Sequence, residues 1–367
     1  MWYRVVQVVF ILLFSGPVVA LDRVKPLNVV LFSPNFNEQD FWGNVHHFAR
    51  ASATSLGINF SVKYNALGGR AHYLESVESV LKSDDKPDAF MAVSFLKITQ
   101  RLLALADKYH VPVILINNAL PEDTSKLIGA PRTIHENFIG HIAADDYRLS
   151  YLLTNYLLER AKMVNKDKVI NMVAIAGSRD APETVLRNKG LDKAVDDSVV
   201  ARLMQRVYAD WRGEEAYRMS HILMKRHDPV QVIWCSSDLM ALNAQRAIEQ
   251  SDRTVFTGGI DWTKEAIESI KAGHLTASAG GHFTDAGYGL VLLYDYFNGR
   301  DFAQVMDLSS HSAAAVIHQG NINNYYDLLI KQDWQSIDFK QFSRVYHPQN
   351  KGYDFSFEHL FKLAAKK

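Results

Sequence analysis

Polar and aromatic side chains follow most of the short apolar runs in this chain, at the places where the runs end. Asn117 and Asn118 follow one run, Trp211 and Asp261 follow two others, and Arg187 lies shortly after a fourth. Amides, carboxylates and a guanidinium can each make paired hydrogen bonds, and indole rings offer flat apolar faces. Groups of these kinds together can hold a polyhydroxylated ring.

Each of these residues alone has a simpler explanation. Asn, Asp and Ser at the end of a strand often cap the following helix, and a tryptophan in a loop often serves only packing. Their recurrence after one run and then the next favours a ligand site over a set of unrelated caps.

Three other kinds of chemistry lack the residues they need. His46 and His47 are neighbours, which on a helix point about 100° apart and cannot easily share a metal ion, and the fourteen histidines include no metalloprotease motif. The glycine pairs at 68–69 and 280–281 match neither a phosphate loop nor a dinucleotide fingerprint, and no Gly-x-Ser-x-Gly turn presents a nucleophile. Cys235 is best explained as a buried structural thiol. We therefore expect no metal, no cofactor and no catalytic activity.

The composition excludes several classes of protein. Forty Lys and Arg balance forty Asp and Glu in 367 residues, without a block of like charge, so we expect no nucleic-acid partner. Hydrophobic residues make up 48% and charged residues 22%, which excludes a mostly disordered chain and a polytopic membrane protein. The single cysteine excludes an intramolecular disulfide.

The first twenty residues differ from the rest of the chain. They hold one arginine, an apolar stretch from Val5 to Phe14, a Gly-Pro break and the ending Val18-Val19-Ala20. This pattern predicts a secretory signal peptide over residues 1–20, because the apolar stretch is shorter than the ~20 residues of a membrane-spanning anchor. Export without disulfides favours the periplasm of a Gram-negative bacterium.

Short β-rich runs alternate with segments of helical period along the remaining chain. The runs are apolar throughout, as expected of parallel strands with helices on both faces. The pattern predicts an α/β fold with two doubly wound parallel sheets, whose ligands bind at the carboxyl ends of the strands. The expected strands are residues 27–33, 58–64, 89–93, 111–116, 169–176, 203–208, 230–234, 255–259 and 275–279, and expected helices include 71–82, 99–110 and 145–162.

Several motifs, in the same order as in a known family, accompany this pattern. They are Asp40-Phe41-Trp42, a helix start at 141–145, the strand end 175–177 followed by 187–191, and the segments 235–242 and 258–261. The chain resembles the periplasmic binding proteins of the ribose and galactose type from residue 27 to about 329. It is also similar to the periplasmic receptor for the quorum signal autoinducer-2.

The resemblance implies two lobes joined by a three-stranded hinge, with crossings near 143–145, Gly281 and Ser310. The first lobe would comprise residues 27–143 and 282–309. The second lobe would comprise residues 144–281 and 310–332. Residues 333–367 would form a C-terminal extension, for which a partner surface, a strap across the lobes and a helix packed on its own domain all remain open.

The resemblance also implies a ligand site in the cleft between the lobes. Phe41 or Trp42 would stack on the ligand from the first lobe and Trp211 from the second, while Arg187 would donate to ligand hydroxyls. The implied contacts are Asn37, Gln39, Phe41, Trp42, Asn117, Asn118, Arg187, Trp211, Ser237, Asp238, Asp261 and His282.

Two departures from the pattern bear on the ligand. Ribose-type members carry Asp-Arg where this chain has Asn117-Asn118, and the autoinducer-2 receptor has an arginine where this chain has Gly280-Gly281. His282 would replace a lost contact. The resemblance therefore implies the family without naming the ligand.

Two functions follow from this resemblance. A solute-binding protein would capture a sugar or related polyol and deliver it to an inner-membrane ABC-type permease. Alternatively, a signal-receptor subunit would use the same clamp to regulate a membrane histidine kinase or diguanylate cyclase. An exported enzyme is disfavoured, because no acid–base pair or nucleophile is visible in the sequence.

Overall fold

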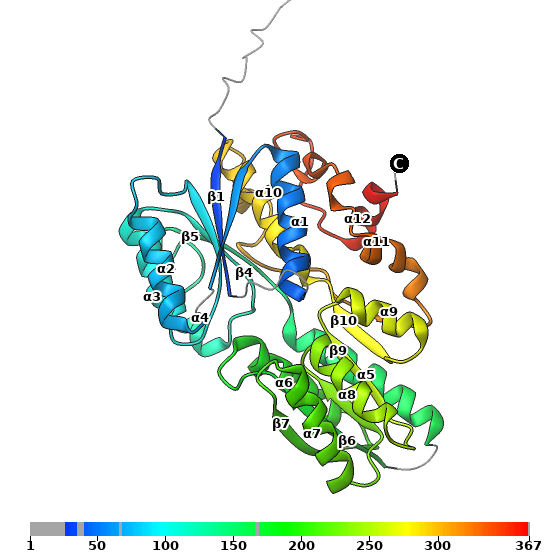
Figure 1. The fold of residues 1–367 in the computed structure, drawn as a ribbon. Coiled ribbons are helices and arrows are strands. Elements are labelled where there is room, and N and C mark those ends of the chain that lie inside the picture. Colours follow the sequence, from blue (N-terminus) through cyan, green and yellow to red (C-terminus); the bar gives the residue numbers. More distant parts are fainter. Residues whose placement is uncertain (1–25, 35–39, 66–67, 166–168, 366–367) are drawn as a thin grey trace, which may run out of the picture.

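The chain forms two α/β lobes, each built on a six-stranded sheet (Figure 1). The computed structural model describes residues 26–34, 40–65, 68–165 and 169–365. The expected signal peptide, residues 1–20, lies outside the described residues. Within the described residues, no helix is both long and apolar enough to cross a bilayer.

The first lobe holds the sheet with strand order β11-β5-β4-β3-β1-β2, all of whose pairings are parallel. Its elements are β1 (Asn28–Ser33), α1 (Phe41–Leu56), β2 (Asn59–Tyr64), α2 (Arg70–Lys82), β3 (Ala89–Val93), α3 (Thr99–Tyr109), β4 (Val113–Asn117), α4 (Glu122–Ile128), β5 (Phe138–Ala143), η1 (His282–Thr284), α10 (Asp285–Phe297), η2 (Phe302–Gln304) and β11 (Ser309–His311).

The second lobe holds the sheet with strand order β12-β10-β9-β8-β6-β7, parallel except for the antiparallel pair β10–β12. Its elements are α5 (Asp146–Val164), β6 (Ile170–Ala176), α6 (Pro182–Asp196), β7 (Ala201–Tyr208), α7 (Gly213–Arg226), β8 (Val232–Cys235), α8 (Asp238–Glu249), β9 (Phe256–Ile260), α9 (Lys264–Ala272), β10 (Ala277–Gly280) and β12 (Ala315–His318).

The predicted α/β class with two doubly wound, mainly parallel sheets is confirmed. Strands β3, β4 and β5 are buried at every residue, as continuous apolar runs between two helical layers require. The edge strand β2 instead alternates between exposed and half-buried residues. Helices therefore cover the sheet centres and leave this edge partly open.

One part of the sequence-based assignment is wrong. The expected helix start at 141–145 is the end of β5, and α5 begins only at Asp146 after its cap Asp145, whose side chain accepts the Arg148 N–H at 2.9 Å. Gly140 inside β5 weakens the sequence signal for a strand. The glycine leaves room for the Phe302 ring, because a Cβ there would lie 3.0 Å from it. The third crossing lies at 312–314, just beyond the expected position, since β11 pairs with β5 as far as His311.

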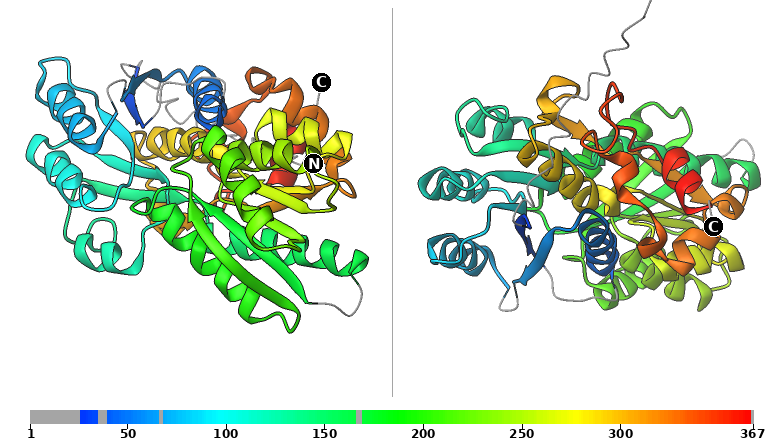
Figure 2. Two further views of the ribbon diagram at one scale, coloured as in Figure 1. Left: turned by 60° about the horizontal axis from the view of Figure 1, so that its bottom comes forward. Right: turned by 90° about the horizontal axis from the view of Figure 1, so that it is seen from above.

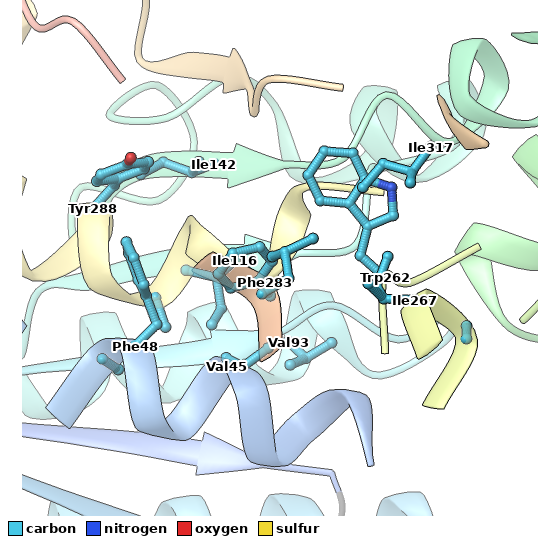
Figure 3. Packing of buried hydrophobic residues seen from close by; sticks show 14 of the residues in the cluster. Val45, Phe48, Val93, Ile116, Ile142, Trp262, Ile267, Phe283, Tyr288 and Ile317 are labelled. Atoms are coloured by element: carbon cyan, nitrogen blue, oxygen red, sulfur yellow. The ribbon is translucent and has the colours of Figure 1, made fainter. Parts of the chain in front are cut away.

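Aromatic packing holds α1 and α10 together on one face of the first sheet. The Phe48 ring contacts Phe283 and Tyr288 edge to face, each with ring centroids 5.5 Å apart (Figure 3). Gly287 on α10 makes this approach possible, since a Cβ there would lie 2.4 Å from Phe48. The packed helices fix the start of α1, which carries Phe41 and Trp42.

The C-terminal segment, residues 326–365, runs along both lobes (Figure 2). Helix α11 (Tyr326–Lys331) packs on α9 of the second lobe, and η4 (Trp334–Ser336) and η5 (Phe339–Phe342) pack on α1 of the first. The segment then returns to the second lobe with α12 (Phe357–Ala364), where the Phe357 ring lies 4.9 Å from that of Trp262. Of the alternatives for this extension, these contacts favour the strap.

Candidate ligand site between the lobes

A cavity of about 360 Å³ lies where the carboxyl ends of both sheets face each other. This volume is within the range of small-ligand sites. Its lining residues are Pro34, Asp40, Phe41, Trp42, Val93, Phe95, Asn117, Asn118, Glu183, Arg187, Trp211, Ser237, Leu239, Asp261, Thr263 and His282. Both lobes therefore contribute residues to a single site between them.

Most of the residues proposed from the sequence meet in this cavity. The nine that line it are Phe41, Trp42, Asn117, Asn118, Arg187, Trp211, Ser237, Asp261 and His282. Two others, Asn37 and Gln39, lie outside the described residues. Asp238 is described but does not line the cavity.

Asp238 supports the site from behind instead of facing it, which corrects the sequence-based expectation. Its carboxylate is fully buried and accepts hydrogen bonds from the Ser278 hydroxyl at 2.7 Å and the Thr263 N–H at 2.9 Å. Burial raises the pKa of Asp238 to about 6, although these donors oppose the shift. The carboxylate thus fixes the loop after β9, while its neighbour Ser237 caps α8 and reaches the cavity.

Arg187 is held rigidly in the second-lobe wall. Its Nε donates to Asp146 Oδ1 at 2.7 Å and its Nη1 to the Ser236 carbonyl at 2.6 Å, and only 4% of the residue is exposed. Gly190 allows α6 to approach α5 this closely, because a Cβ there would lie 2.1 Å from the Tyr147 carbonyl oxygen. The remaining guanidinium hydrogens are thereby aimed in a fixed direction, as bidentate recognition requires.

Asp261 and His282 lie next to this arginine. The Asp261 Oδ1 atom is 3.8 Å from Arg187 Nη1 and 3.7 Å from His282 Nε2. Burial, together with the charge of Arg187, lowers the pKa of His282 well below its usual value, so this imidazole is neutral at pH 7. Burial raises the pKa of Asp261 well above its usual value, and the nearby carboxylates of Asp238 and Asp40 add to the shift.

Aromatic rings enter the cavity from both lobes. The Trp211 ring lies directly on Gly177, where a Cβ would be 2.2 Å away, and Trp211 itself has a φ of 61°. From the first lobe, the Phe41 ring is 5.4 Å from that of Trp42 and 4.6 Å from the imidazole of His282. Such faces can stack on the apolar side of a ring-shaped ligand.

Unusual backbone conformations accompany these side chains. Asn117, Trp211 and Asp261 line the cavity and all have φ between +60° and +150°. A non-glycine residue pays a conformational cost there, of order 1–3 kcal/mol each. The chain therefore tolerates strain at the strand ends that form the site.

The two asparagines differ in availability. The Asn118 Nδ2 donates to the Ser94 carbonyl at 3.1 Å, which commits this amide to the protein. The Asn117 Nδ2 is buried and has no hydrogen-bond partner among the described residues. Asn117 therefore leaves a donor for a bound molecule, since unpaired buried donors are costly.

Glu183 lines the cavity in the first turn of α6 and is not among the contacts expected from the sequence. Its Oε2 is buried and has no hydrogen-bond partner among the described residues. Burial, reinforced by the charge of Asp146, raises the pKa of Glu183 to about 7. Its spacing from Arg187 is the sequence signal that could have identified it. The two residues are four apart and therefore share one face of the helix.

One ion pair links the lobes beside this helix. The Arg70 guanidinium at the start of α2 lies 2.5 Å from the Asp180 carboxylate and donates to the Asp180 carbonyl at 3.0 Å. Asp180 belongs to the connection between β6 and α6. The pair therefore joins the two walls in the conformation observed.

Metal chemistry has no evident place in the described part of the chain. No group of three or more His, Cys, Asp or Glu side chains there could hold an ion. The cavity is suited to an organic molecule that stacks on rings and makes hydrogen bonds.

Known proteins resemble this chain in sequence and structure. The ribose import binding protein of Haemophilus influenzae is 27% identical over 176 residues, which cover 48% of this chain and 54% of that protein. The chain thus matches about half the length of this curated relative. A solved periplasmic sugar-binding protein from Pseudomonas fluorescens is 26% identical, with a TM-score of 0.81 over 91% of this chain and 99% of that one.

A further solved structure shares the fold. An ABC transporter solute-binding protein from Actinobacillus succinogenes, crystallised with bound D-allose, is 18% identical, with a TM-score of 0.71 over 82% of this chain and all of that one. The model of the periplasmic binding protein domain family matches residues 29–301, which include most of both lobes and every described lining residue. This chain is a member of the periplasmic binding protein family of type I fold.

Proposed function

We propose that this protein captures a sugar or sugar-like polyol between its lobes and delivers it to an inner-membrane ABC-type permease. The observation that carries the proposal is the interlobe cavity, in which a rigid Arg187 and the Trp211 ring on one lobe face Phe41 and Trp42 on the other. A molecule that touches both walls stabilises the lobes in their closed arrangement. A permease can distinguish that arrangement from an open one.

The comparisons support a sugar over other small molecules. The sequence relative is a ribose import binding protein, and a protein of the same fold holds D-allose. We further propose that the protein acts in the periplasm of a Gram-negative bacterium, with residues 1–20 as the export signal. It is proposed to bind its ligand without chemical change, with no cofactor.

A receptor role is the second candidate, and the C-terminal segment favours it. Its contacts with α1 of one lobe and with Trp262 of the other would couple a surface element to lobe closure. Autoinducer-2 itself fits poorly. That receptor has an arginine at this place, where this chain has Gly280-Gly281. A Cβ at Gly280 would lie 2.6 Å from Trp262 and one at Gly281 would lie 2.2 Å from Phe357, so an arginine side chain does not fit at either position.

A thermal-shift screen tests the binding function. The exported protein would be unfolded and refolded to strip bound molecules, then heated with monosaccharides, polyols and autoinducer-2. A ligand at 100 times its Kd adds ~2.7 kcal/mol to the free energy of unfolding and raises Tm. The shift should vanish in Arg187→Lys, which keeps a charge beside Asp146 but loses the planar fork. An unchanged shift in this variant contradicts the assigned site.

Uptake then separates the two candidate functions. Cells lacking this protein should lose uptake of the radiolabelled hit if it serves a permease. If uptake is unaffected while a kinase- or cyclic-di-GMP-dependent response to the hit is lost, the receptor role replaces the transport role.

A further inference from the structure

Acidic side chains outnumber cationic ones around the cavity. Asp40, Glu183 and Asp261 line it, whereas Arg187 is the one cationic residue among the described lining residues, since His282 is neutral. Arg187 already has a buried ion-pair partner in Asp146, 2.7 Å away. Among the described residues, the ion pairs of Arg187 are therefore with Asp146 and, at 3.8 Å, with Asp261, and none is with Glu183.

Glu183 is the lining acid that has a buried carboxyl oxygen without a hydrogen-bond partner among the described residues. The charged groups that face it are Asp146 on α5, Arg187 on its own helix and Arg70 on α2. Arg187 is committed to Asp146, and Arg70 to Asp180 at 2.5 Å. The buried Oε2 of Glu183 thus lines the cavity with no partner among the described residues.

Two further acids, Asp40 and Asp261, line the same cavity from the first and the second lobe. Asp40 caps the first-lobe helix α1, and its charge raises the pKa of Asp261 on the second lobe.

We propose that the ligand is a polyhydroxylated ring bearing a protonated nitrogen, an amino sugar or iminosugar, and that Glu183 accepts a hydrogen bond from that nitrogen. This inference rests on the proposed function, sugar-like binding in the interlobe cavity, and narrows the ligand class.

The remaining lining groups suit such a ligand. The electron-rich faces of Trp211 and Phe41 attract organic cations as well as the apolar face of a sugar. Arg187 and the unpartnered Asn117 Nδ2 donate to hydroxyls. A protonated nitrogen among the carboxylates also favours their ionised forms, so binding releases protons.

Matched sugars test the proposal by calorimetry on the stripped, refolded protein. The pairs are D-glucosamine against D-glucose and N-acetyl-D-glucosamine, D-galactosamine against D-galactose, and 1,4-dideoxy-1,4-imino-D-ribitol against D-ribose. In at least one pair the cationic member should bind about tenfold tighter than its neutral partner, as a charge-assisted hydrogen bond allows. Glu183→Gln should remove most of this preference for the cationic member.

Glu265→Gln is the matched control. Glu265 also lies in the first turn of a helix, α9, but is exposed and does not line the cavity. This variant should keep the preference for the cationic member. Titrations at pH 6.5 in two buffers of different ionisation enthalpy should show proton release by wild type and less by Glu183→Gln, which loss of shape alone would not produce.

The outcomes separate this inference from the function on which it rests. Neutral sugars that bind as tightly as their cationic partners overturn the inference and leave sugar binding intact. A preference that survives in Glu183→Gln overturns the role of Glu183. If no sugar binds, neutral or cationic, the proposed function itself is contradicted.

Discussion

The two walls of the cavity are built from different kinds of side chain. The first-lobe wall presents mainly rings and amides, including Phe41, Trp42 and Asn117, with one acid, Asp40. The second-lobe wall presents Glu183, Arg187 and Asp261 beside a single ring, Trp211. Rings supply contact area and tolerate small shifts of a ligand, while buried charged groups demand one orientation. From this difference we predict that the second lobe sets specificity and that the first lobe mainly covers the ligand.

The largest effect on binding and stability is expected when Arg187 is removed from the second-lobe wall. Arg187→Ala would leave the buried Asp146 carboxylate without its partner, so we expect a loss of about 3–5 kcal/mol in the free energy of unfolding and no detectable sugar binding. Urea unfolding and calorimetry measure the two effects. Normal stability in this variant would show that Asp146 does not depend on Arg187.

Removing a ring from each wall compares their contributions directly. Trp211→Ala and Phe41→Ala should each weaken binding by about 10- to 100-fold, because each removes a stacking face. Trp211 sits strained on Gly177, so its loss should cost binding without a comparable loss of stability. Stronger weakening in Phe41→Ala than in Arg187→Lys would reverse the proposed division between the walls.

A pH-dependent effect should come from Glu183. Its pKa is raised from 4.5 to about 7 in the folded protein, so the folded state binds the proton more tightly than the unfolded state. Stability from this group is therefore present at low pH and is lost as pH rises through about 7. Relative to Glu183→Gln, the unliganded wild type should gain about 2 kcal/mol between pH 7.5 and pH 5.5.

Thermal unfolding of both proteins across this pH range measures that gain. Equal pH dependence in wild type and Glu183→Gln would mean that the Glu183 carboxylate is solvated. Glu183 would then be ionised at neutral pH like an exposed acid, and the second-lobe wall would lack the buried, tightly held carboxyl group that the comparison requires.

The smallest effect is expected at the ion pair between the walls. Arg70→Ala or Asp180→Ala should weaken ligand binding by about two- to fivefold, because the pair is partly exposed and such pairs contribute ~0.2–1 kcal/mol. The double variant should be no weaker than either single one. Stopped-flow measurements should place the change in the dissociation rate, and an unchanged rate would show that the pair does not hold the lobes closed.

The sequence predicts the fold well because its signals are local. Continuous apolar runs and helical periods mark β1, β3 and β6 regardless of their neighbours. The signal fails for β5, where Gly140 and His141 interrupt the apolar run and only packing against Phe302 and pairing with β4 and β11 define a strand. Long-range pairing of this kind is not visible in a single sequence.

The site is predicted less completely, for a related reason. Asp238 and Asp261 both follow strands, yet the chain buries one against Ser278 and turns the other to the cavity. A carboxylate after a strand looks the same in the sequence in either role. Glu183 was missed because an acid in the first turn of a helix is usually a favourable interaction with the helix dipole.

The most direct test of the account is a crystal structure of the protein with the sugar-like molecule that binds most tightly in the screen. The account predicts one ring between Trp211 and the Phe41–Trp42 side, with Arg187 donating to its hydroxyls and Glu183 within hydrogen-bond distance of its nitrogen. A ligand bound elsewhere, or one that occupies the cavity without contacting Arg187, would contradict it.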